Sequence, residues 1–599
     1  MTDKIKPNVP AKHVVYQVFT RLFGNTNTTN KPWGTLEENG IGKFNDFTDK
    51  ALSEIKQLGV SHIWYTGVPH HAVVRDYSEY GISSDHPSVV KGRAGSPYAV
   101  KDYYNVNPDL AVDPANRLEE FKALIERSHR HGLKVIIDIV PNHVARRYQG
   151  ITNPAGGEDF GASDDTALVY HRDNNFYYIP NEAFTVPDAE NGYLPLGGEA
   201  HPDLDTPYEE FPAKWTGNGS RRAKPQFDDW YETVKVNYGV KPDGSKDFDE
   251  LPQGFNKKAH TEHFEFWQGK SVPDSWVKFR DIALYWLALG VDGFRYDMAE
   301  MVPVEFWSYM NSSIKQLNPE TFLMAEVYQP NLYRDYIHLG KMDYLYDKVD
   351  LYDALKLVMQ GRGSTDAIVE VQQQLMDIEH HMLHFLDNHD EQRVASPEFA
   401  GDANKGKPAM LVSTTLSTSP TMIYSGQEVG EAGVEDAGFG LHSRTTIFDY
   451  FGVPSHQRWM NNGAFDGGLL TDEEHELRDF YQRLLNFSLT STAMLGEYQE
   501  IHRHNREHSD TYNEQLFCFS RYDQQQKLLV VANFAEHDQG MVMIKLPSSL
   551  IDAWQLDNGE YTLTEQLDGN HTVVLSVANG IGELQLSISS LSSMILQLN

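Results

Sequence analysis

Three carboxyl residues, Asp297, Glu326 and Asp390, each stand just after a run of apolar residues. In a fold with parallel strands such runs are buried, and the residues that follow them meet at one rim. Carboxyl groups that are crowded together acquire separated pKa values, so that one stays ionised while another holds its proton. An acid and a nucleophile of this kind are what the cleavage of a glycosidic bond requires.

Further polar residues accompany these carboxyls. Arg295 lies two residues before Asp297, on the same face of a strand, where its charge would orient Asp297 and keep it ionised. An aspartate buried against an arginine can also be only a structural ion pair, and that alternative stands beside the catalytic one. His389 and His143 also follow apolar runs. We expect Asp138, which lies inside such a run, to face the packed interior as a structural residue.

Eight strand-like runs must position these residues. They lie at residues 14–19, 60–65, 133–140, 291–296, 321–325, about 342–346, 382–386 and 421–424. Apolar residues at helical spacing separate them, and Gly59, Gly132 and Gly290 stand where helices should end. Asn116 with Glu119 predicts a capping box at one helix start. Eight strands that alternate with helices predict an α/β fold, a closed (β/α)8 TIM barrel with its active site at the C-terminal ends of the strands.

Two segments depart from this alternation. Residues 144–260 are rich in Gly, Pro, Asn, Asp and Tyr and have no long periodic helix, which predicts an inserted irregular domain after the third strand. Residues 491–599 contain short β runs separated by turn residues, which predicts a C-terminal all-β sandwich. The barrel itself would then comprise residues 1–143 and 261–490.

Four segments of the sequence resemble the four ordered signature regions of the α-amylase family, glycoside hydrolase family 13. They are DIVPNH at 138–143, GFRYD at 293–297, MAEV at 324–327 and FLDNHD at 385–390. Each follows a predicted strand, and the four occur in the family's order. The resemblance extends from about residue 14 to 490 and includes the family's usual C-terminal β domain.

The resemblance implies a catalytic role for each of the three carboxyls. Asp297 would be the nucleophile that forms a covalent glycosyl-enzyme, and Glu326 would protonate the leaving oxygen and later deprotonate water. Asp390 would hold sugar hydroxyls and stabilise the oxocarbenium-like transition state. Such a mechanism retains the anomeric configuration, and we expect the carboxyls of Asp297 and Glu326 to lie about 5–5.5 Å apart.

The resemblance also implies contacts to the sugar that is cleaved. Tyr98 would stack on its apolar face, and His143 and His389 would bond its hydroxyls. Arg295 would orient the nucleophile. Many relatives that release single glucose units carry an aspartate after the stacking tyrosine, whereas this chain has Ala99. That difference favours an open site that accepts longer glucans.

Calcium is the metal ion that the resemblance to the family implies. Asn142 matches a typical calcium ligand of the family, and no cofactor is required for the chemistry itself. The companion acids would come from the inserted segment, where the candidates are Asp159, Asp203, Asp205, Asp228 and Asp229. Calcium prefers six to eight oxygens, and the sequence does not assemble that set. A structural Ca²⁺ with Asn142 as one ligand is therefore an expectation only.

Two positions depart from the family pattern or match it ambiguously. The family often has Lys-His shortly after the nucleophile, where this chain has Glu300 and Met301. The usual sugar contacts beyond the cleavage point are therefore in doubt. The family's fifth region matches residues 201–205 by letters, or residues 234–238 by their place near the fourth strand, and we favour the second.

Three functions compete. The first is a retaining hydrolase of α-1,4-glucosidic bonds in starch, glycogen or maltodextrins. The second is an α-glucan transglycosylase or isomerase that transfers maltosyl or glucosyl units on the same scaffold. The third is a non-catalytic binding or partner protein. Such relatives lose catalytic carboxyls, whereas this chain has all three. Glucan length, endo or exo action, α-1,6 tolerance and oligomeric state stay open.

Composition narrows the partners and the compartment. The 599 residues carry 51 basic and 85 acidic side chains, a formal net charge of −34, which disfavours nucleic acids and anionic membranes as partners. No apolar stretch approaches the roughly 18 residues of a membrane helix. The single cysteine, Cys518, excludes an intramolecular disulfide. Residues 1–7 do not resemble a signal peptide, so we expect a cytoplasmic protein, or a periplasmic or secreted one if a leader was removed.

Overall fold

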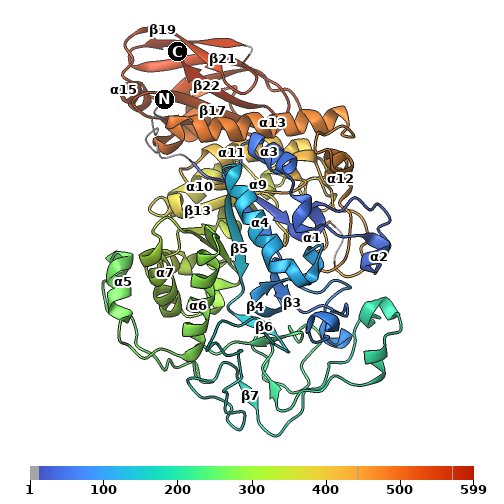
Figure 1. Ribbon diagram of the computed structural model, residues 1–599. Coiled ribbons are helices and arrows are strands. Elements are labelled where there is room, and N and C mark those ends of the chain that lie inside the picture. Colours follow the sequence, from blue (N-terminus) through green and yellow to red (C-terminus); the bar gives the residue numbers. More distant parts are fainter. Residues whose placement is uncertain (1–11, 441–442, 570) are drawn as a thin grey trace, which may run out of the picture.

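A closed barrel of eight parallel strands forms the centre of the protein in the computed structural model, which describes residues 12–440, 443–569 and 571–599 (Figure 1). Its strands are β1 (Val14–Phe19), β2 (His62–Thr66), β5 (Lys134–Ile139), β10 (Gly293–Tyr296), β11 (Phe322–Ala325), β12 (Tyr344–Tyr346), β13 (Met382–Phe385) and β14 (Thr421–Tyr424). Around the barrel they follow the order β1-β14-β13-β12-β11-β10-β5-β2. All eight predicted strands are present.

Helices surround the barrel and pack on its outer face. They are α1 (Thr20–Phe23), α2 (Leu36–Asn39), α3 (Asp49–Gln57), α4 (Arg117–Arg130), α5 (His260–Trp267), α6 (Asp274–Ala288), α7 (Val304–Leu317), α8 (Tyr333–His338), α9 (Asp353–Met359), α10 (Asp366–Leu375), α11 (Gly406–Thr415), α12 (Pro454–Met460) and α13 (Asp472–Thr490). Gly59, Gly132 and Gly290 follow the ends of α3, α4 and α6 with positive φ, as predicted.

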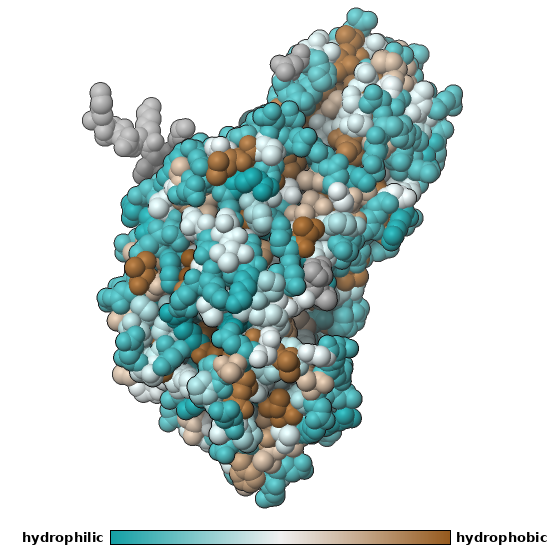
Figure 2. Space-filling model, turned by 90° about the vertical axis from the view of Figure 1, so that its right-hand side faces the viewer, coloured by the Kyte–Doolittle hydropathy of each residue, from teal (hydrophilic) through white to brown (hydrophobic). Residues whose placement is uncertain are grey.

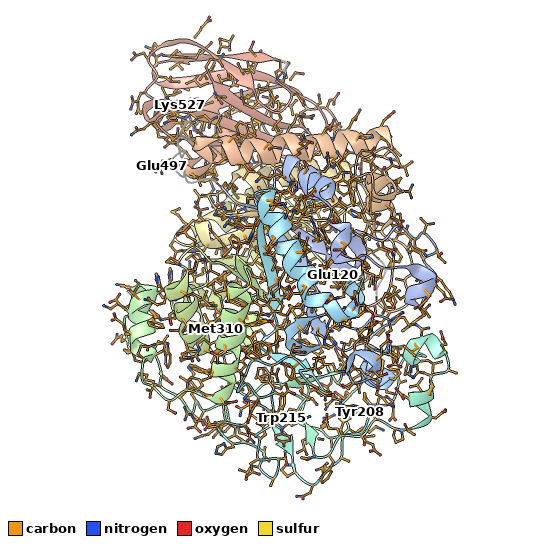
Figure 3. The ribbon with its side chains drawn as sticks, viewed as in Figure 1. Glu120, Tyr208, Trp215, Met310, Glu497 and Lys527 are labelled. Carbon is orange, nitrogen blue, oxygen red and sulfur yellow. The ribbon has the colours of Figure 1, made fainter. Side chains whose placement is uncertain are left out.

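The start of α4 differs from its prediction. The Asn116 side chain accepts no capping hydrogen bond from the helix backbone, so the predicted capping box is wrong. The chain enters the helix through a tight turn, Pro114–Asn116, that gives Asn116 φ −105° and ψ 16° instead of an extended conformation. Glu120, labelled in Figure 3, accepts hydrogen bonds from the backbone N–H groups of Val112 and Asp113 at 2.8 Å each.

The segment after β5 has little regular structure. Its strands are β6 (His143–Ala145), β7 (Tyr178–Ile179), β8 (Ala213–Lys214) and β9 (Thr233–Lys235), and β6 pairs with β9 while β7 pairs with β8. A further antiparallel pair, β3 (Pro69–His71) and β4 (Val100–Val106), lies between β2 and α4. In Figure 1 the irregular segment after β5 and the C-terminal sheet lie at opposite ends of the barrel.

Eight antiparallel strands form the C-terminal domain. They are β15 (Glu497–Glu500), β16 (Leu516–Tyr522), β17 (Lys527–Asn533), β18 (Gly540–Leu546), β19 (Gly559–Glu565), β20 (Thr572–Ala578), β21 (Ile581–Ile588) and β22 (Ser593–Leu598), with the short helices α14 (His502–His508) and α15 (Ser548–Trp554). They make one sheet in the order β15-β16-β17-β22-β19-β20-β21-β18. Leu529 of β17 and Val542 of β18 belong to one buried cluster, so the sheet curves into two layers. The predicted fold class, a TIM barrel with a C-terminal β domain, is confirmed.

The surface is mainly polar. Hydrophilic side chains cover most of the face shown in Figure 2, and apolar ones are scattered over it. The large apolar residues with the most exposure, such as Phe211, Met376 and Leu317, come from separate segments. Among the described residues, no helix combines the length and the apolar character that crossing a membrane needs.

Candidate active site

Arg295 joins two of the predicted catalytic carboxyls at the mouth of the barrel. It lies on β10 and is fully buried, with Asp297 just after the same strand and Glu326 just after β11. Its Nη1 lies 2.7 Å from Asp297 Oδ1, and its Nη2 lies 2.9 Å from Glu326 Oε2. One guanidinium thus bridges the two carboxyls, which brings them together on one side of the mouth.

Aromatic rings hold Arg295 in place. Its Nε donates to the hydroxyl of Tyr346, at the end of β12, at 3.1 Å. Its guanidinium carbon lies 5.2 Å from the ring centre of Trp64 and 5.5 Å from that of Tyr98. Cation–π contacts of this kind fix the planar fork of an arginine without neutralising it, so its charge stays available to the carboxyls.

Asp138 lies on β5, near Arg295. Trp64 Nε1 donates to its Oδ2 at 3.0 Å, and Arg295 Nη1 lies 3.5 Å from its Oδ1. Burial raises the pKa of Asp138 to about 6, although Arg295 and Trp64 oppose the shift. The side chain is only 3% exposed, which is the interior position expected for a structural residue.

Two of the three carboxyls have raised pKa values. Burial raises the pKa of Asp297 well above its ordinary range; Arg295 opposes the shift, and the charges of Glu326 and Asp390 add to it. Burial, together with the charge of Glu326, raises the pKa of Asp390 to about 7. Asp297 and Asp390 therefore hold a proton more readily than isolated carboxyls do, as expected for acids that are crowded together and removed from water.

His389 connects Asp390 to Tyr98. Its ring stacks on Tyr98 with centres 5.3 Å apart at 28°, and its Nε2 is hydrogen-bonded to the Tyr98 hydroxyl. The same Nε2 lies 3.1 Å from Asp390 Oδ2, while Nδ1 lies 2.8 Å from the side-chain nitrogen of Gln17. Burial, with the charge of Arg295, holds the pKa of His389 well below its ordinary value. His389 is therefore a neutral hydrogen-bonding group.

The loop after β13 is shaped by its own side chains. Asn388 Oδ1 accepts from the backbone N–H groups of Asp390 and Glu391 at 2.8 Å each. Asp387 Oδ1 accepts from the backbone N–H of Val394 at 2.9 Å. The side chain of Asp390, at 37% exposed, turns towards the open mouth, whereas Asp387 is buried.

His143 lines the same mouth from the side of the inserted segment. Its ring centre lies 5.4 Å from that of Trp230, and it stands opposite Lys235 where β6 pairs with β9. Burial, together with the positive charges of Lys235 and Lys91, lowers the pKa of His143 to about 3. A neutral imidazole can exchange hydrogen bonds with hydroxyl groups.

The surroundings of Asn142 do not fit a calcium ion. The ammonium of Lys235 donates to Asn142 Oδ1 and, at 3.3 Å, to the backbone carbonyl of Met301. Burial lowers the pKa of Lys235 to about 8, which leaves it charged at neutral pH. A cation that already occupies these oxygens repels a second one. Nor do three or more His, Cys, Asp or Glu side chains gather as metal ligands anywhere in the part of the chain that the structure describes.

Glu300 stands where many members of the family have a residue that contacts the sugar beyond the cleavage point. Here its carboxylate binds the protein backbone. Its Oε2 accepts from the backbone N–H groups of Tyr328 and Gln329 at 2.9 and 3.0 Å. Glu300 thus holds the loop after β11 instead of pointing a charge along the cleft. The segment after Asp297 is used for positioning here, with the carbonyl of Met301 bound to Lys235.

All eight predicted site residues lie at this one mouth, but four of their partners were missed. Gln17, Trp64 and Tyr346 come from β1, β2 and β12, and Lys235 comes from β9. Side chains along a barrel strand point alternately into and out of the barrel. This alternation is the signal that could have identified Gln17, Trp64 and Tyr346. Lys235 lies in the segment that we favoured as the fifth family region, and it stands opposite His143.

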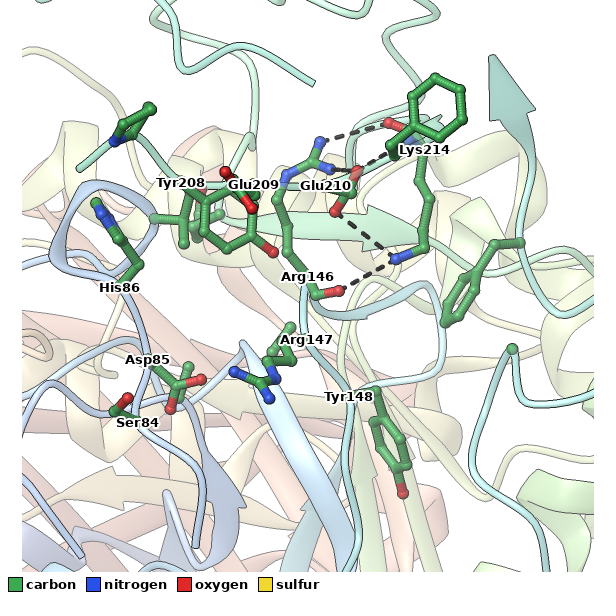
Figure 4. A pocket seen from close by; sticks show the side chains of 18 of the residues that line it. Ser84, Asp85, His86, Arg146, Arg147, Tyr148, Tyr208, Glu209, Glu210 and Lys214 are labelled. Carbon is green, nitrogen blue, oxygen red and sulfur yellow. Dashed lines mark hydrogen bonds and ion pairs between the residues drawn. The ribbon is translucent and has the colours of Figure 1, made fainter. Parts of the chain in front are cut away.

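A larger pocket lies outside this site. It has a volume of about 780 Å³ and is lined by residues that include those shown in Figure 4, and none of them is a predicted catalytic or sugar-binding residue. Arg146 Nη1 lies 2.5 Å from Glu210 Oε1, and Lys214 lies 3.6 Å from the same carboxylate. These three charges thus satisfy one another within the pocket.

Comparisons with known proteins agree with this geometry. A family model described as the catalytic domain of alpha-amylase matches residues 17–183 and 266–464, more than half of the chain. The cyclomaltodextrin glucanotransferase of Bacillus sp. (strain 38-2) is 24% identical over 443 residues, which are 70% of this chain and 50% of that protein. Neopullulanase 2 of Thermoactinomyces vulgaris is 22% identical over 565 residues, 92% of this chain and 73% of that protein. The chain therefore spans only half the length of the first of these relatives.

A solved structure shows the same fold. The crystal structure of an alpha-amylase from H. orenii matches 99% of this chain and 100% of its own, with a TM-score of 0.59 and 20% identity. The catalytic-domain match includes Arg295 on β10 and the three carboxyls, which follow β10, β11 and β13. The chain belongs to the α-amylase family.

Proposed function

We propose that this protein is a retaining glycoside hydrolase that cleaves α-1,4-glucosidic bonds in starch, glycogen or maltodextrins. The observation that carries the proposal is the Arg295 guanidinium, which bonds Asp297 and Glu326 at 2.7 and 2.9 Å. Two carboxyls held this close, in a buried mouth, suit a double-displacement mechanism. The polar groups around them suit the hydroxyls of a sugar.

In the first step Asp297 Oδ attacks the anomeric carbon and forms an ester bond to it. The bond from that carbon to the glycosidic oxygen breaks, and the proton of Glu326 goes to the departing oxygen. Arg295 orients Asp297 and favours its charge, while burial and crowding keep a proton on the cluster. Asp390 stabilises the positive charge that develops on the sugar ring.

In the second step Glu326, now ionised, takes a proton from water. The water oxygen attacks the anomeric carbon, the ester to Asp297 breaks, and both carboxyls return to their starting states. Two inversions give net retention. Tyr98 and His389, which stack on each other, and His143 would bind the sugar throughout.

Transglycosylation is the second candidate, because one relative is named cyclomaltodextrin glucanotransferase. It uses the same residues and differs only in whether water or a sugar hydroxyl reaches the glycosyl-enzyme. Incubation with maltoheptaose separates the two functions. Hydrolysis releases one new reducing end for each bond broken, whereas disproportionation yields longer and shorter glucans at a constant number of reducing ends.

Substitution of the two carboxyls tests the assigned roles. We expect Asp297→Asn to lower kcat on maltoheptaose by several orders of magnitude with an unchanged melting temperature, because the ester cannot form. Glu326→Gln should lose natural substrates but keep those with activated leaving groups, which need no proton. Wild-type turnover by Asp297→Asn would show that another residue is the nucleophile.

A further inference from the structure

Four aromatic side chains, Trp33, Tyr193, Phe439 and Phe448, form a continuous chain of ring contacts beside the site. We call them the aromatic bridge. Ring centres are 6.2 Å apart for Trp33 and Tyr193, 6.0 Å for Trp33 and Phe439, 5.9 Å for Tyr193 and Phe439, and 4.9 Å for Phe439 and Phe448. None of these residues takes part in the mechanism described above.

The bridge joins three segments that follow strands on one arc of the barrel rim. Trp33 follows β1, Tyr193 belongs to the inserted segment after β5, and Phe439 and Phe448 follow β14. In the barrel order, β14, β1, β2 and β5 are consecutive neighbours. The bridge therefore connects the loop after β14 to the inserted segment along this arc of the rim.

Backbone contacts fix the bridge. The N–H of Trp33 donates to the carbonyl of Ala437 at 3.0 Å, and Arg93 Nε donates to the carbonyl of Trp33 at the same distance. Arg93 also forms an ion pair with Glu199 of the inserted segment. The N–H of Ala94 donates to the carbonyl of Phe448 at 2.8 Å. The segments that carry the bridge are thus tied to one another.

Two glycines permit the close approach to Trp33. A Cβ on Gly197 would lie 2.6 Å from the Trp33 ring, and a Cβ on Gly438 would lie 2.6 Å from the Trp33 nitrogen. Both glycines also have positive φ, 67° and 117°. Any side chain at either position would force the two walls apart, so this contact depends on glycine.

The bridge lies on the side of the sugar that is transferred. β11, which carries Glu326, is four strands away from β1 in the ring of eight, directly across the barrel. Glu326 faces the leaving group, so the leaving part of the substrate extends away from the bridge. Tyr98 and Phe448 pack against one apolar cluster that includes Phe19 and Ile447. The bridge therefore begins beside the ring that would stack on the cleaved sugar.

We propose that the aromatic bridge closes the non-reducing end of the cleft, so that the enzyme acts as an exo-hydrolase on the ends of glucan chains. This inference rests on the proposed function. The substrate of the enzyme would be a glucan chain with a free non-reducing end. A glucan that runs on past the bridge has no path through it. The absence of an aspartate at Ala99 does not open the site, because Ala99 packs in an apolar cluster with Val90 and Leu196.

A blocked substrate tests the inference. The probes are two p-nitrophenyl maltoheptaosides, one free and one with an ethylidene block on its non-reducing glucose. We expect the full chain to cleave the blocked probe at least about tenfold more slowly, because the added group cannot be seated against the bridge. With amylose as substrate, new reducing ends should appear while viscosity falls slowly.

Variants assign the effect to the bridge. Trp33→Ala and, separately, Tyr193→Ala should speed cleavage of the blocked probe relative to the free one and accelerate the fall in viscosity. Tyr170→Ala, an aromatic of the inserted segment outside the bridge, should leave both ratios unchanged. Melting temperatures identify a variant that fails to fold, in which case the other bridge variant decides.

The outcomes separate this inference from the proposed function. Equal cleavage of both probes by the wild-type enzyme, or unchanged ratios in a folded bridge variant, overturns the bridge as a barrier and leaves hydrolysis intact. No cleavage of either probe or of amylose overturns the proposed function, and the exo-hydrolase inference with it.

Discussion

Arg295 organises the site at the scale of single residues. It bonds two carboxyls, approaches a third, Asp138, and is itself held by Trp64 and Tyr346. The motif residues could be predicted because each motif already combines an acid with its neighbours. The supporting aromatics could not be predicted, because an aromatic residue in a strand looks the same whether it fills the core or holds an arginine.

The electrostatics of Asp390 lead to a prediction about pH. The charge of Glu391 contributes to raising the pKa of Asp390, which is about 7, so Glu391→Gln should lower it. A lower pKa keeps Asp390 ionised in more acidic solution. We therefore expect the acidic limb of kcat/KM to move to lower pH by about half a unit, the size of an interaction below 1 kcal/mol.

Glu398→Gln is the matched control, because it removes the same charge from an exposed turn nearby. Its profile should coincide with that of the wild-type enzyme. An acidic limb that moves to higher pH in Glu391→Gln, or that moves equally in both variants, would contradict the assigned role of Asp390.

At the scale of elements, the pairing of β6 with β9 places Lys235 opposite His143 and beside Asn142. Sequence alone supported two segments as the fifth family region. Residues 201–205 match its amino acids, whereas residues 234–238 match its place near the fourth strand. Register decides such cases, and register depends on the tertiary fold. The cap of α4 was mispredicted for a similar reason, since a preceding turn changed the conformation of Asn116.

The position of Lys235 leads to a prediction about metals. Dialysis against a chelator and addition of CaCl2 should both leave the melting temperature of the wild-type protein unchanged, because the ammonium already bonds the oxygens of Asn142 and Met301. Lys235→Met should destabilise the protein by about 2–4 kcal/mol, since both acceptors lose their partner. Calorimetry measures both effects.

A melting temperature that falls on chelation and recovers with Ca²⁺ would contradict this account of the Asn142 site. Lys224→Met serves as the control, because Lys224 is an exposed lysine of the same segment that pairs only with Asp188 at the surface. Its removal should change stability by less than about 1 kcal/mol.

At the scale of the whole molecule, the C-terminal sheet and the barrel share one apolar core. Phe517 and Val530 of the sheet belong to the same buried cluster as the barrel strands. Arg521, on β16, is fully buried and donates to the carbonyls of Leu416, Met494 and Gly496, at distances of 3.2, 2.8 and 2.9 Å. Sequence predicted both domains from their periodicities, but contacts between distant segments leave no periodic signal.

This shared core predicts a single cooperative unfolding transition. Arg521→Met should lower the melting temperature of the whole chain and destabilise it by about 3 kcal/mol or more, because several buried carbonyls lose their donor. Arg503→Met, at an exposed position on α14, should have little effect. Two well-separated transitions in the wild-type protein would contradict the idea of one core.

The most direct test of the central claim is to trap the glycosyl-enzyme. Incubation with a fluorinated maltosyl fluoride, followed by proteolysis and mass spectrometry, identifies the residue that carries the sugar. The account predicts a stable adduct on the peptide that contains Asp297, absent in Asp297→Asn, and a released product with retained anomeric configuration. An adduct on Glu326 or Asp390, or an inverted product formed without any adduct, would contradict it.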